Sequence, residues 1–232
     1  MSLRVLVIGD GKMGKAVASV ATERGCTVVG VFGPADMEGG IANGVADVAI
    51  EFTEPKAAAA NVRACLAARI PVVSGTTGWD VELERVRDEA RAGDGTMLHA
   101  PNFSVGVQLM KQLVELSARF SSGLKAQGFG LHLIETHHAE KLDAPSGTAK
   151  MFARVAATAL GRELPVTSVR VGRVPGTHEL VLDAPFEQVR VTHEARDRRV
   201  FADGAVAAAK WLVGRRGVFT FEDFVNDQLR AK

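Results

Sequence analysis

The chain has 232 residues, 47% of them hydrophobic, and its 28 basic and 27 acidic side chains leave a formal charge of +1. This length and apolar content suffice for one large domain or two small ones, and they exclude an intrinsically disordered chain. The balanced charge would not attract a polyanion, so we expect no nucleic-acid partner. No apolar run has the length of a membrane span or the form of a signal peptide, so the sequence predicts a cytoplasmic protein without a membrane partner.

The two cysteines, Cys26 and Cys65, lie in apolar segments and have neither a pairing pattern nor metal-ligand spacing. Such cysteines are typical of a reducing compartment. We expect both to be inert thiols in the core, and the sequence predicts no metal site.

In the first hundred residues, short apolar runs alternate with helical patterns. Strands are predicted at residues 4–9, 27–32, 47–52, 70–75 and 96–101. Helices are predicted after Gly11, from Pro55 to about residue 69, and after a capping Asp80. Near-continuous apolar strands that alternate with helices are typical of a parallel sheet covered on both faces.

The pattern changes after residue 102. A long amphipathic helix at 105–120 is followed by a half-buried strand at 129–136, and three more alternating runs lie near 166–174, 178–183 and 187–195. Tight turns rather than helices join these last runs, which predicts an α+β domain with an open mixed or antiparallel sheet. The tail returns to helices that we expect to pack on the first domain. The predicted domains are therefore 1–103 with 205–232, and 104–204.

Gly9, Gly11 and Gly14 form a GxGxxG motif between the first strand and the first helix. Glycines there allow the backbone to turn tightly and approach a pyrophosphate, whose charge meets the amides at the start of the helix. The alternative is a tight turn with no ligand. Because the motif opens a correctly ordered βαβ unit, the sequence predicts a Rossmann-type dinucleotide site, with these candidate residues: Gly9, Asp10, Gly11, Lys12, Met13 and Gly14.

The acidic residue that usually ends the second strand and binds the ribose hydroxyls is absent. Phe32 and Gly33 stand at that position, and Asp36 comes later, where it could equally be a loop residue. Without this acid the main repulsion against a 2′-phosphate is missing, and Lys12 offers a positive charge nearby. The choice between NADH and NADPH therefore stays open.

Further candidates for cofactor contacts lie at the carboxyl ends of later strands, where parallel sheets bind ligands. They come from "EFTEP", "SGTTGW" and "HAPNFS", the last of which lies at the predicted domain boundary. Each stretch could also be a plain turn. The candidate residues are Phe52, Thr53, Gly75, Thr76, Thr77, Ala100, Pro101, Asn102 and Phe103.

The stretch "ETHHAEKLDAPSGTAK" at 135–150 predicts a socket for a small anion. His137 and His138 follow a strand and should point to opposite faces, so one can do chemistry while the other binds. A short loop can bring Lys141 beside them, and Ser146 is a candidate N-cap, which leaves the amides of Ser146, Gly147 and Thr148 for a carboxylate. A solvated turn is the alternative for the histidine pair. Ordinary roles are expected for the remaining histidines: His99, His132, His178 and His193.

Together with "SGTTGW", "PNFSVGV" and "FADGAVAAAKWL", this stretch resembles the 4-hydroxy-tetrahydrodipicolinate reductases of lysine and diaminopimelate biosynthesis, in particular their shorter members. The resemblance runs from the glycine turn to near the C-terminus. It implies a nucleotide-binding domain completed by the tail, and a substrate domain whose sheet builds a homotetramer. The implied reaction is hydride transfer from NADH or NADPH to a small cyclic dicarboxylate.

The resemblance also implies roles for single residues. His137 matches the family's proton donor and acceptor, and Lys141 its second donor. His138 and the backbone of Gly147 and Thr148 match contacts to the substrate carboxylates. Cofactor contacts are implied for residues 75–77 and 100–103. One departure is Glu51, which stands where the family usually has Asp before Phe and Thr.

Two other functions are compatible with the glycine turn. One is another two-domain dehydrogenase, acting on a semialdehyde or a polyol, and the other is a catalytically silent NAD(P) sensor. The chain contains no tyrosine, which excludes the Tyr-Lys acid pair of one large class of dehydrogenases.

Overall fold

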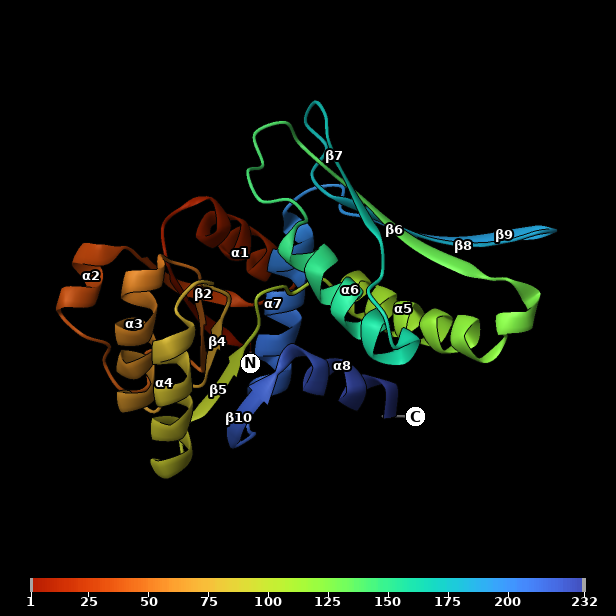
Figure 1. Ribbon diagram of the computed structural model, residues 1–232. Coiled ribbons are helices and arrows are strands. Elements are labelled where there is room, and N and C mark those ends of the chain that lie inside the picture. Colours follow the sequence, from red (N-terminus) through yellow and green to blue (C-terminus); the bar gives the residue numbers. More distant parts are fainter. Residues whose placement is uncertain (1, 231–232) are drawn as a thin grey trace. The chain divides into compact units, whose positions relative to one another are not determined.

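The structure is a computed structural model that describes residues 2–230, and its contacts divide the chain into two compact units (Figure 1). The first unit ends at Ser104 and resumes at Arg198, and the second is Val105–Asp197. Residues 198–204, predicted to lie in the substrate domain, belong instead to the first unit, because they begin a helix that packs there. Residues 1, 231 and 232 of the predicted ranges lie outside the described residues.

The first unit contains a six-stranded sheet in the order β10-β5-β4-β3-β1-β2, with every neighbouring pair parallel. Its strands are β1 (Arg4–Ile8), β2 (Thr27–Phe32), β3 (Val48–Glu51), β4 (Val72–Ser74), β5 (Thr96–His99) and β10 (Gly217–Thr220). Its helices are α1 (Lys12–Glu23), α2 (Pro34–Glu38), α3 (Pro55–Ala67), α4 (Asp80–Ala92), α7 (Arg199–Leu212) and α8 (Phe221–Arg230). β2 lies on one side of β1, and β3, the next strand along the chain, lies on the other side. The strand order therefore reverses at β1, and open α/β sheets bind ligands at such a switch point.

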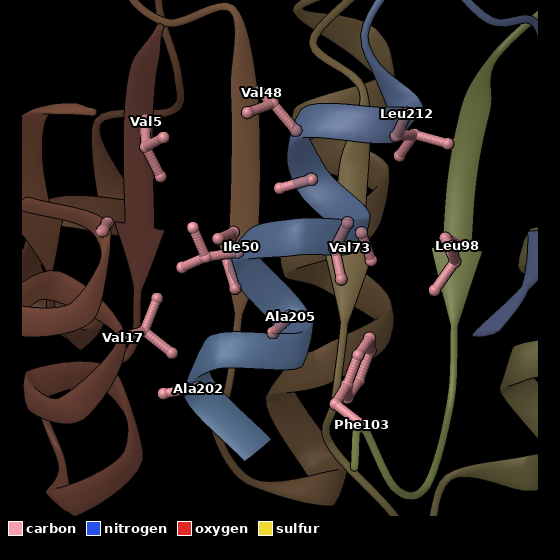
Figure 2. Packing of buried hydrophobic residues seen from close by; sticks show 14 of the residues in the cluster. Val5, Val17, Val48, Ile50, Val73, Leu98, Phe103, Ala202, Ala205 and Leu212 are labelled. Carbon is pink, nitrogen blue, oxygen red and sulfur yellow. The ribbon is translucent and has the colours of Figure 1, made fainter. Parts of the chain in front are cut away.

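Helices cover both faces of this sheet, which explains the near-continuous apolar strands. Val5 and Val7 of β1 belong to the cluster packed under α1 and α7, whereas Leu6 and Ile8 belong to the cluster under α3 and α4. In Figure 2, α7 lies across the first of these faces, with Ala205 close to the sheet. Burying each such aliphatic side chain contributes about 1.5 to 3 kcal/mol relative to leaving it exposed.

Two details of the first unit differ from the prediction. The tail was predicted to be helical, but four of its residues form β10 and pair with β5. This run is too short to show a strand period of its own. In addition, Asp80 is the first residue of α4 and Trp79 is its N-cap, because the amide of Leu83 donates to the carbonyl of Trp79 at 2.9 Å. The Trp79 indole donates to the carbonyl of Thr76 at 2.8 Å and holds the preceding turn. The prediction that Pro55 opens α3 is confirmed.

The second unit contains a four-stranded sheet in the order β7-β6-β8-β9. Its elements are α5 (Val105–Gly123), a 3₁₀ turn (Lys125–Gln127), β6 (Gly130–His137), α6 (Gly147–Leu160), β7 (Val166–Arg170), β8 (Thr177–Ala184) and β9 (Glu187–Glu194). β6 and β7 are parallel and the other pairs are antiparallel, so the predicted open mixed sheet is confirmed.

The core of the second unit becomes polar at one end. Leu133 and Leu180 are paired across β6 and β8 and pack in the cluster that α5 and α6 cover. Two residues along the strands, Glu135 pairs with His178, and His178 pairs with His193. Strand alternation keeps these three side chains on the same face as the leucines. A row of titratable groups therefore crosses the sheet beside the end of its apolar core.

Both cysteines are buried and free, as predicted. Burial raises the pKa of the Cys65 thiol to about 12, so this side chain stays protonated and unreactive. Within residues 2–230, none of the helices combines the length and the apolar character needed to cross a membrane.

Candidate active site

The glycine turn has the close backbone contacts that its spacing predicts. Gly9 has φ +113°, and a Cβ atom there would lie 2.0 Å from the carbonyl oxygen of Phe52. A Cβ atom on Gly14 would lie 1.7 Å from the carbonyl oxygen of Gly9. At Gly11, by contrast, no neighbouring atom lies within 4 Å of the Cβ position, so the backbone before α1 faces open space. This combination fits a pyrophosphate approaching the start of the helix.

A cavity of about 570 Å³ lies beside this turn, at the carboxyl ends of β1, β2 and β3. Of the predicted cofactor residues, the following line it: Gly9, Asp10, Gly11, Phe52 and Thr53. Gly33 and Pro34, which follow β2, complete the same wall. Lys12 and Met13 lie in the first turn of α1. Gly14 packs against the backbone of Gly9 and so allows the helix to lie close to the glycine turn.

Glu51 at the end of β3 was not predicted as part of the site. Its side chain is fully buried, and its carboxylate accepts hydrogen bonds from the amide of Thr53 at 3.0 Å, the Thr76 hydroxyl at 2.6 Å and the Ser74 hydroxyl at 2.6 Å. It therefore joins the ends of β3 and β4 at the cavity. The sequence signal was the charge of Glu51 between the apolar residues of "VAIEF".

The remaining predicted cofactor residues lie in the first unit as well. A Cβ atom on Gly75 would lie 2.1 Å from the Phe52 ring, so a side chain there would displace that ring. Thr77, next to the buried Thr76, is exposed. In the 100–103 stretch, Ala100 and Phe103 are buried, Pro101 is exposed and Asn102 is half-buried. The Phe103 ring contacts Phe52 and Phe221 in the core, so only its backbone remains for a ligand contact.

In the second unit, Glu135 is the centre of the candidate socket. This fully buried carboxylate accepts two hydrogen bonds from the Arg170 guanidinium, at 2.8 and 3.0 Å, and one from the amide of Ser146 at 3.3 Å. It also binds Nδ1 of His137. Burial acts to raise the pKa of Glu135, but the hydrogen bonds from Arg170, Ser168 and His137 outweigh it and lower the pKa to about 2. The group is therefore a permanent acceptor at neutral pH.

An ionised Glu135 determines which nitrogen of His137 carries the proton. Because Nδ1 must donate to the carboxylate, Nε2 is left for another partner. A Cβ atom on Gly176 would lie 3.1 Å from this Nε2, so a glycine directly before β8 keeps the space beside it open. Burial lowers the pKa of His137, and the charges of Lys141 and Arg170 lower it further against the effect of Glu135.

Lys141 lies in the loop after β6. Its ammonium donates to Asp143 at 2.7 Å and lies close enough to lower the pKa of His137. Arg170 donates to the carbonyl oxygens of Lys141 and Asp143, at 3.2 and 2.6 Å, and so ties this loop to β7. His138 follows the strand directly and is half-buried. Neither Glu135 nor Arg170 was among the predicted site residues.

Ser146 is the N-cap of α6, as predicted, and its hydroxyl accepts a hydrogen bond from the amide of Ala149 at 3.1 Å. Gly147, the first residue of the helix, is exposed, and Thr148 is half-buried. The positive end of the helix dipole therefore lies at the surface of the loop that carries Lys141. A carboxylate is the kind of group that this arrangement attracts.

His178 was predicted to have an ordinary role, but it lies beside the catalytic candidates. Its Nε2 is 3.2 Å from the Ser146 hydroxyl, and its ring centroid is 5.4 Å from that of His137. Burial, reinforced by the neighbouring His137 and His193, lowers the pKa of His178 to about 4. His178 lies here because β8 pairs with β6, and this pairing could not be predicted from the spacing of residues in the sequence. Residues 2–230 contain no group of His, Cys, Asp and Glu side chains arranged to hold a metal ion.

Comparison with known proteins identifies the family to which the chain belongs. It matches the families described as "Dihydrodipicolinate reductase, N-terminus" over residues 3–103 and "Dihydrodipicolinate reductase, C-terminus" over residues 106–225. The chain belongs to the dihydrodipicolinate reductase family. A 4-hydroxy-tetrahydrodipicolinate reductase from Christiangramia forsetii is 33% identical, with 97% of this chain and 98% of the relative covered. One from Haloarcula marismortui is 36% identical, with 96% and 99% covered.

A solved dihydrodipicolinate reductase from Paenisporosarcina, described as bound to dipicolinate, has the same fold. It is 23% identical, with a TM-score of 0.78, and the alignment covers 96% of this chain and 99% of that one. In the present member of the family, the glycine turn and its cavity belong to the first unit, and the socket around Glu135 and His137 belongs to the second.

Proposed function

We propose that this chain is a 4-hydroxy-tetrahydrodipicolinate reductase, which uses the hydride of NADH or NADPH and a proton to form tetrahydrodipicolinate in lysine and diaminopimelate biosynthesis, while the substrate hydroxyl leaves as water. The observation that carries the proposal is the socket, where Nε2 of His137 remains available beside the ammonium of Lys141 and the start of α6. Full-length relatives at 33% and 36% identity carry the name of this activity.

The first unit provides the cofactor site. The amide of Gly11 and the first turn of α1 meet the pyrophosphate, and Phe52 and Thr53 line the same cavity. Gly75–Thr77 and the backbone of 100–103 are further contacts, at the ends of β4 and β5. The nicotinamide supplies a hydride, and the residues of this chain supply orientation and protons.

The substrate carboxylates are held in the second unit. Lys141 and His138 bind them from the loop after β6, and the amides of Gly147 and Thr148 bind them from the start of α6, next to the Ser146 cap. Fixing both carboxylates orients the ring for reaction and excludes other poses. The dicarboxylate in the name of the Paenisporosarcina structure, dipicolinate, has the charge pattern that such a socket accommodates.

His137 is the proton donor in this proposal, and Lys141 is the second donor. Free His137 is neutral at pH 7 because its pKa is lowered. Burial is the main cause that lowers this pKa, and the charges of Lys141 and Arg170 lower it further. Two substrate carboxylates bring negative charge to the socket, which acts to raise the pKa again. The bound substrate thus promotes protonation of His137, and the imidazolium then gives the proton from Nε2 while Glu135 keeps Nδ1 in place.

The experiment that tests this function is a coupled assay. A synthase generates the cyclic substrate from pyruvate and aspartate semialdehyde, and oxidation of NADH and of NADPH is followed separately. Oxidation that depends on the synthase supports the reductase. If neither nucleotide is oxidised, although nucleotide binding is measurable, the reductase proposal is wrong and a silent NAD(P) sensor takes its place.

We also propose that the enzyme is a cytoplasmic homotetramer, as the family resemblance implies. Its buried, free cysteines suit a reducing compartment. Light scattering from the purified protein gives the mass directly, and a monomeric mass at working concentration would refute the tetramer.

A further inference from the structure

The cavity of the first unit has no acidic residue at the end of β2. In many dinucleotide-binding folds an acid at this position accepts hydrogen bonds from the ribose hydroxyls of the adenosine. Here β2 ends at Phe32 and Gly33 follows it. From the sequence alone, this absence permits NADPH as readily as NADH.

The structure places a carboxylate at this position from another part of the chain. A Cβ atom on Gly33 would lie 2.9 Å from Oδ2 of Asp10 and 3.2 Å from its Cγ. The Asp10 side chain therefore occupies the space that a side chain on Gly33 would fill. The φ of Gly33 is −89°, which any residue can adopt, so the glycine provides room rather than conformational freedom. Asp10 and Gly33 both line the cavity.

Asp10 is also available to a ligand. Its side chain is exposed, and within the part of the chain that the structure describes it makes no hydrogen bond or ion pair. The other acid near Gly33 is already used, because the Asp36 carboxylate accepts a hydrogen bond from the Gly33 amide at 2.8 Å and caps α2. Lys56 lines the cavity too, and its ammonium lies 3.3 Å from the Glu54 carboxylate.

We propose that Asp10 recognises the ribose hydroxyls of the adenosine and makes NADH the preferred cofactor. In this chain the acid belongs to the glycine turn instead of the end of β2, and Gly33 leaves room for its side chain. A carboxylate accepts hydrogen bonds from two adjacent hydroxyls, whereas it repels a 2′-phosphate at the same place. The inference concerns the nucleotide alone and rests on the proposed use of a nicotinamide cofactor.

Direct binding tests this proposal without turnover. NADH and NADPH are titrated separately against the full-length protein, and binding is followed by the nucleotide fluorescence. We expect wild-type protein to bind NADH at least about tenfold more tightly than NADPH, as a charged hydrogen-bonding group allows. Asp10→Asn should weaken NADH binding by roughly tenfold and bind NADPH as tightly as wild type or more tightly, since the repulsion is gone.

Asp36→Asn is the matched control. It removes the same charge three residues beyond Gly33, and its amide oxygen can still cap α2, so the preference for NADH should persist. Retained NADPH binding by Asp10→Asn also shows that the unit is folded. Equal affinities in wild type, an unchanged ratio in Asp10→Asn, or an equal shift in Asp36→Asn would each overturn the proposal. A preference for NADH that Asp10→Asn abolishes, in a protein that fails the coupled assay, supports the role of Asp10 while refuting the reductase.

Discussion

The carboxylate of Glu135 binds Nδ1 of His137, two residues further along the same strand. Alternation in β6 puts both side chains on the face that also carries Leu131 and Leu133. Arg170, from the parallel neighbour β7, balances the buried charge with two hydrogen bonds to the same carboxylate. The buried Glu135 therefore fixes the orientation of the His137 imidazole, and Nε2 of this ring faces away from Glu135.

Replacing Glu135 with Gln should reduce kcat by about 100-fold, the usual loss when a group that orients and charges a catalytic histidine is removed. Glutamine keeps the shape but cannot fix the Nδ1 proton or balance Arg170. As Glu135 acts to raise the pKa of His137, and the protonated imidazole is the active form, the alkaline limb of the pH profile of kcat should also move to lower pH. Glu179→Gln is the control, on β8 and paired with the more exposed Arg190. A normal kcat and pH profile in Glu135→Gln would exclude this orienting role.

His137→Gln should lower kcat by at least about 100-fold, because a general acid contributes this much or more to a proton transfer. Binding of dipicolinate, measured by calorimetry, should remain, since Lys141 and the start of α6 still hold the carboxylates. The matched control is His132→Gln on the same strand, whose ring contacts the Thr167 hydroxyl at 2.7 Å on the other side of the sheet. Near-wild-type turnover in His137→Gln would show that the proton comes from elsewhere.

The stability of the protein should fall as the pH is lowered, partly because of His178. Its pKa is about 4 in the folded protein, against an ordinary value of 6.5, so between these values the unfolded chain binds a proton that the folded chain does not. The stabilising contribution is complete above about pH 6.5 and is lost progressively toward pH 4, up to roughly 3 kcal/mol. Urea unfolding at several pH values measures this change.

The variant His178→Gln removes this titrating group and should flatten the pH dependence, although it also loses the ring contact with Phe152. His132→Gln, on the opposite face of the same sheet, should keep the wild-type slope. An unchanged slope in His178→Gln would mean that other groups account for the loss of stability in acid.

Gly204→Ala should destabilise the first unit by about 3 kcal/mol, in the range of severe overpacking. A Cβ atom there would lie 1.8 Å from the carbonyl oxygen of Phe103 and 3.2 Å from the Phe221 ring, so α7 could not keep its distance from residue 103. Gly39→Ala is the control, because its nearest atom would be 3.9 Å away and its φ is −78°. Chemical denaturation of both variants measures the difference. Equal free energies of unfolding for the two variants would show that α7 can shift to accommodate the added methyl group without loss of stability.

Local signals in the sequence were sufficient for much of the fold. Glycine spacing predicted the turn before α1, Pro55 predicted the start of α3, and Ser146 predicted the cap of α6. These features depend on backbone geometry within a few residues of each side chain. The short strand β10 was missed because it is defined by its pairing with β5. The N-cap of α4 was placed one residue late because the buried Trp79 sets that turn.

The sequence by itself determined the family, the order of most strands and helices, and the two segments that carry the candidate chemistry. Which side chains support that chemistry was decided by the tertiary structure. Glu135 meets Arg170 from 35 residues away because β6 and β7 pair in parallel. Asp10 reaches Gly33 because β1 and β2 end together in the same sheet. Strand register brings such groups together, and neither residue type nor local spacing specifies which strands will pair.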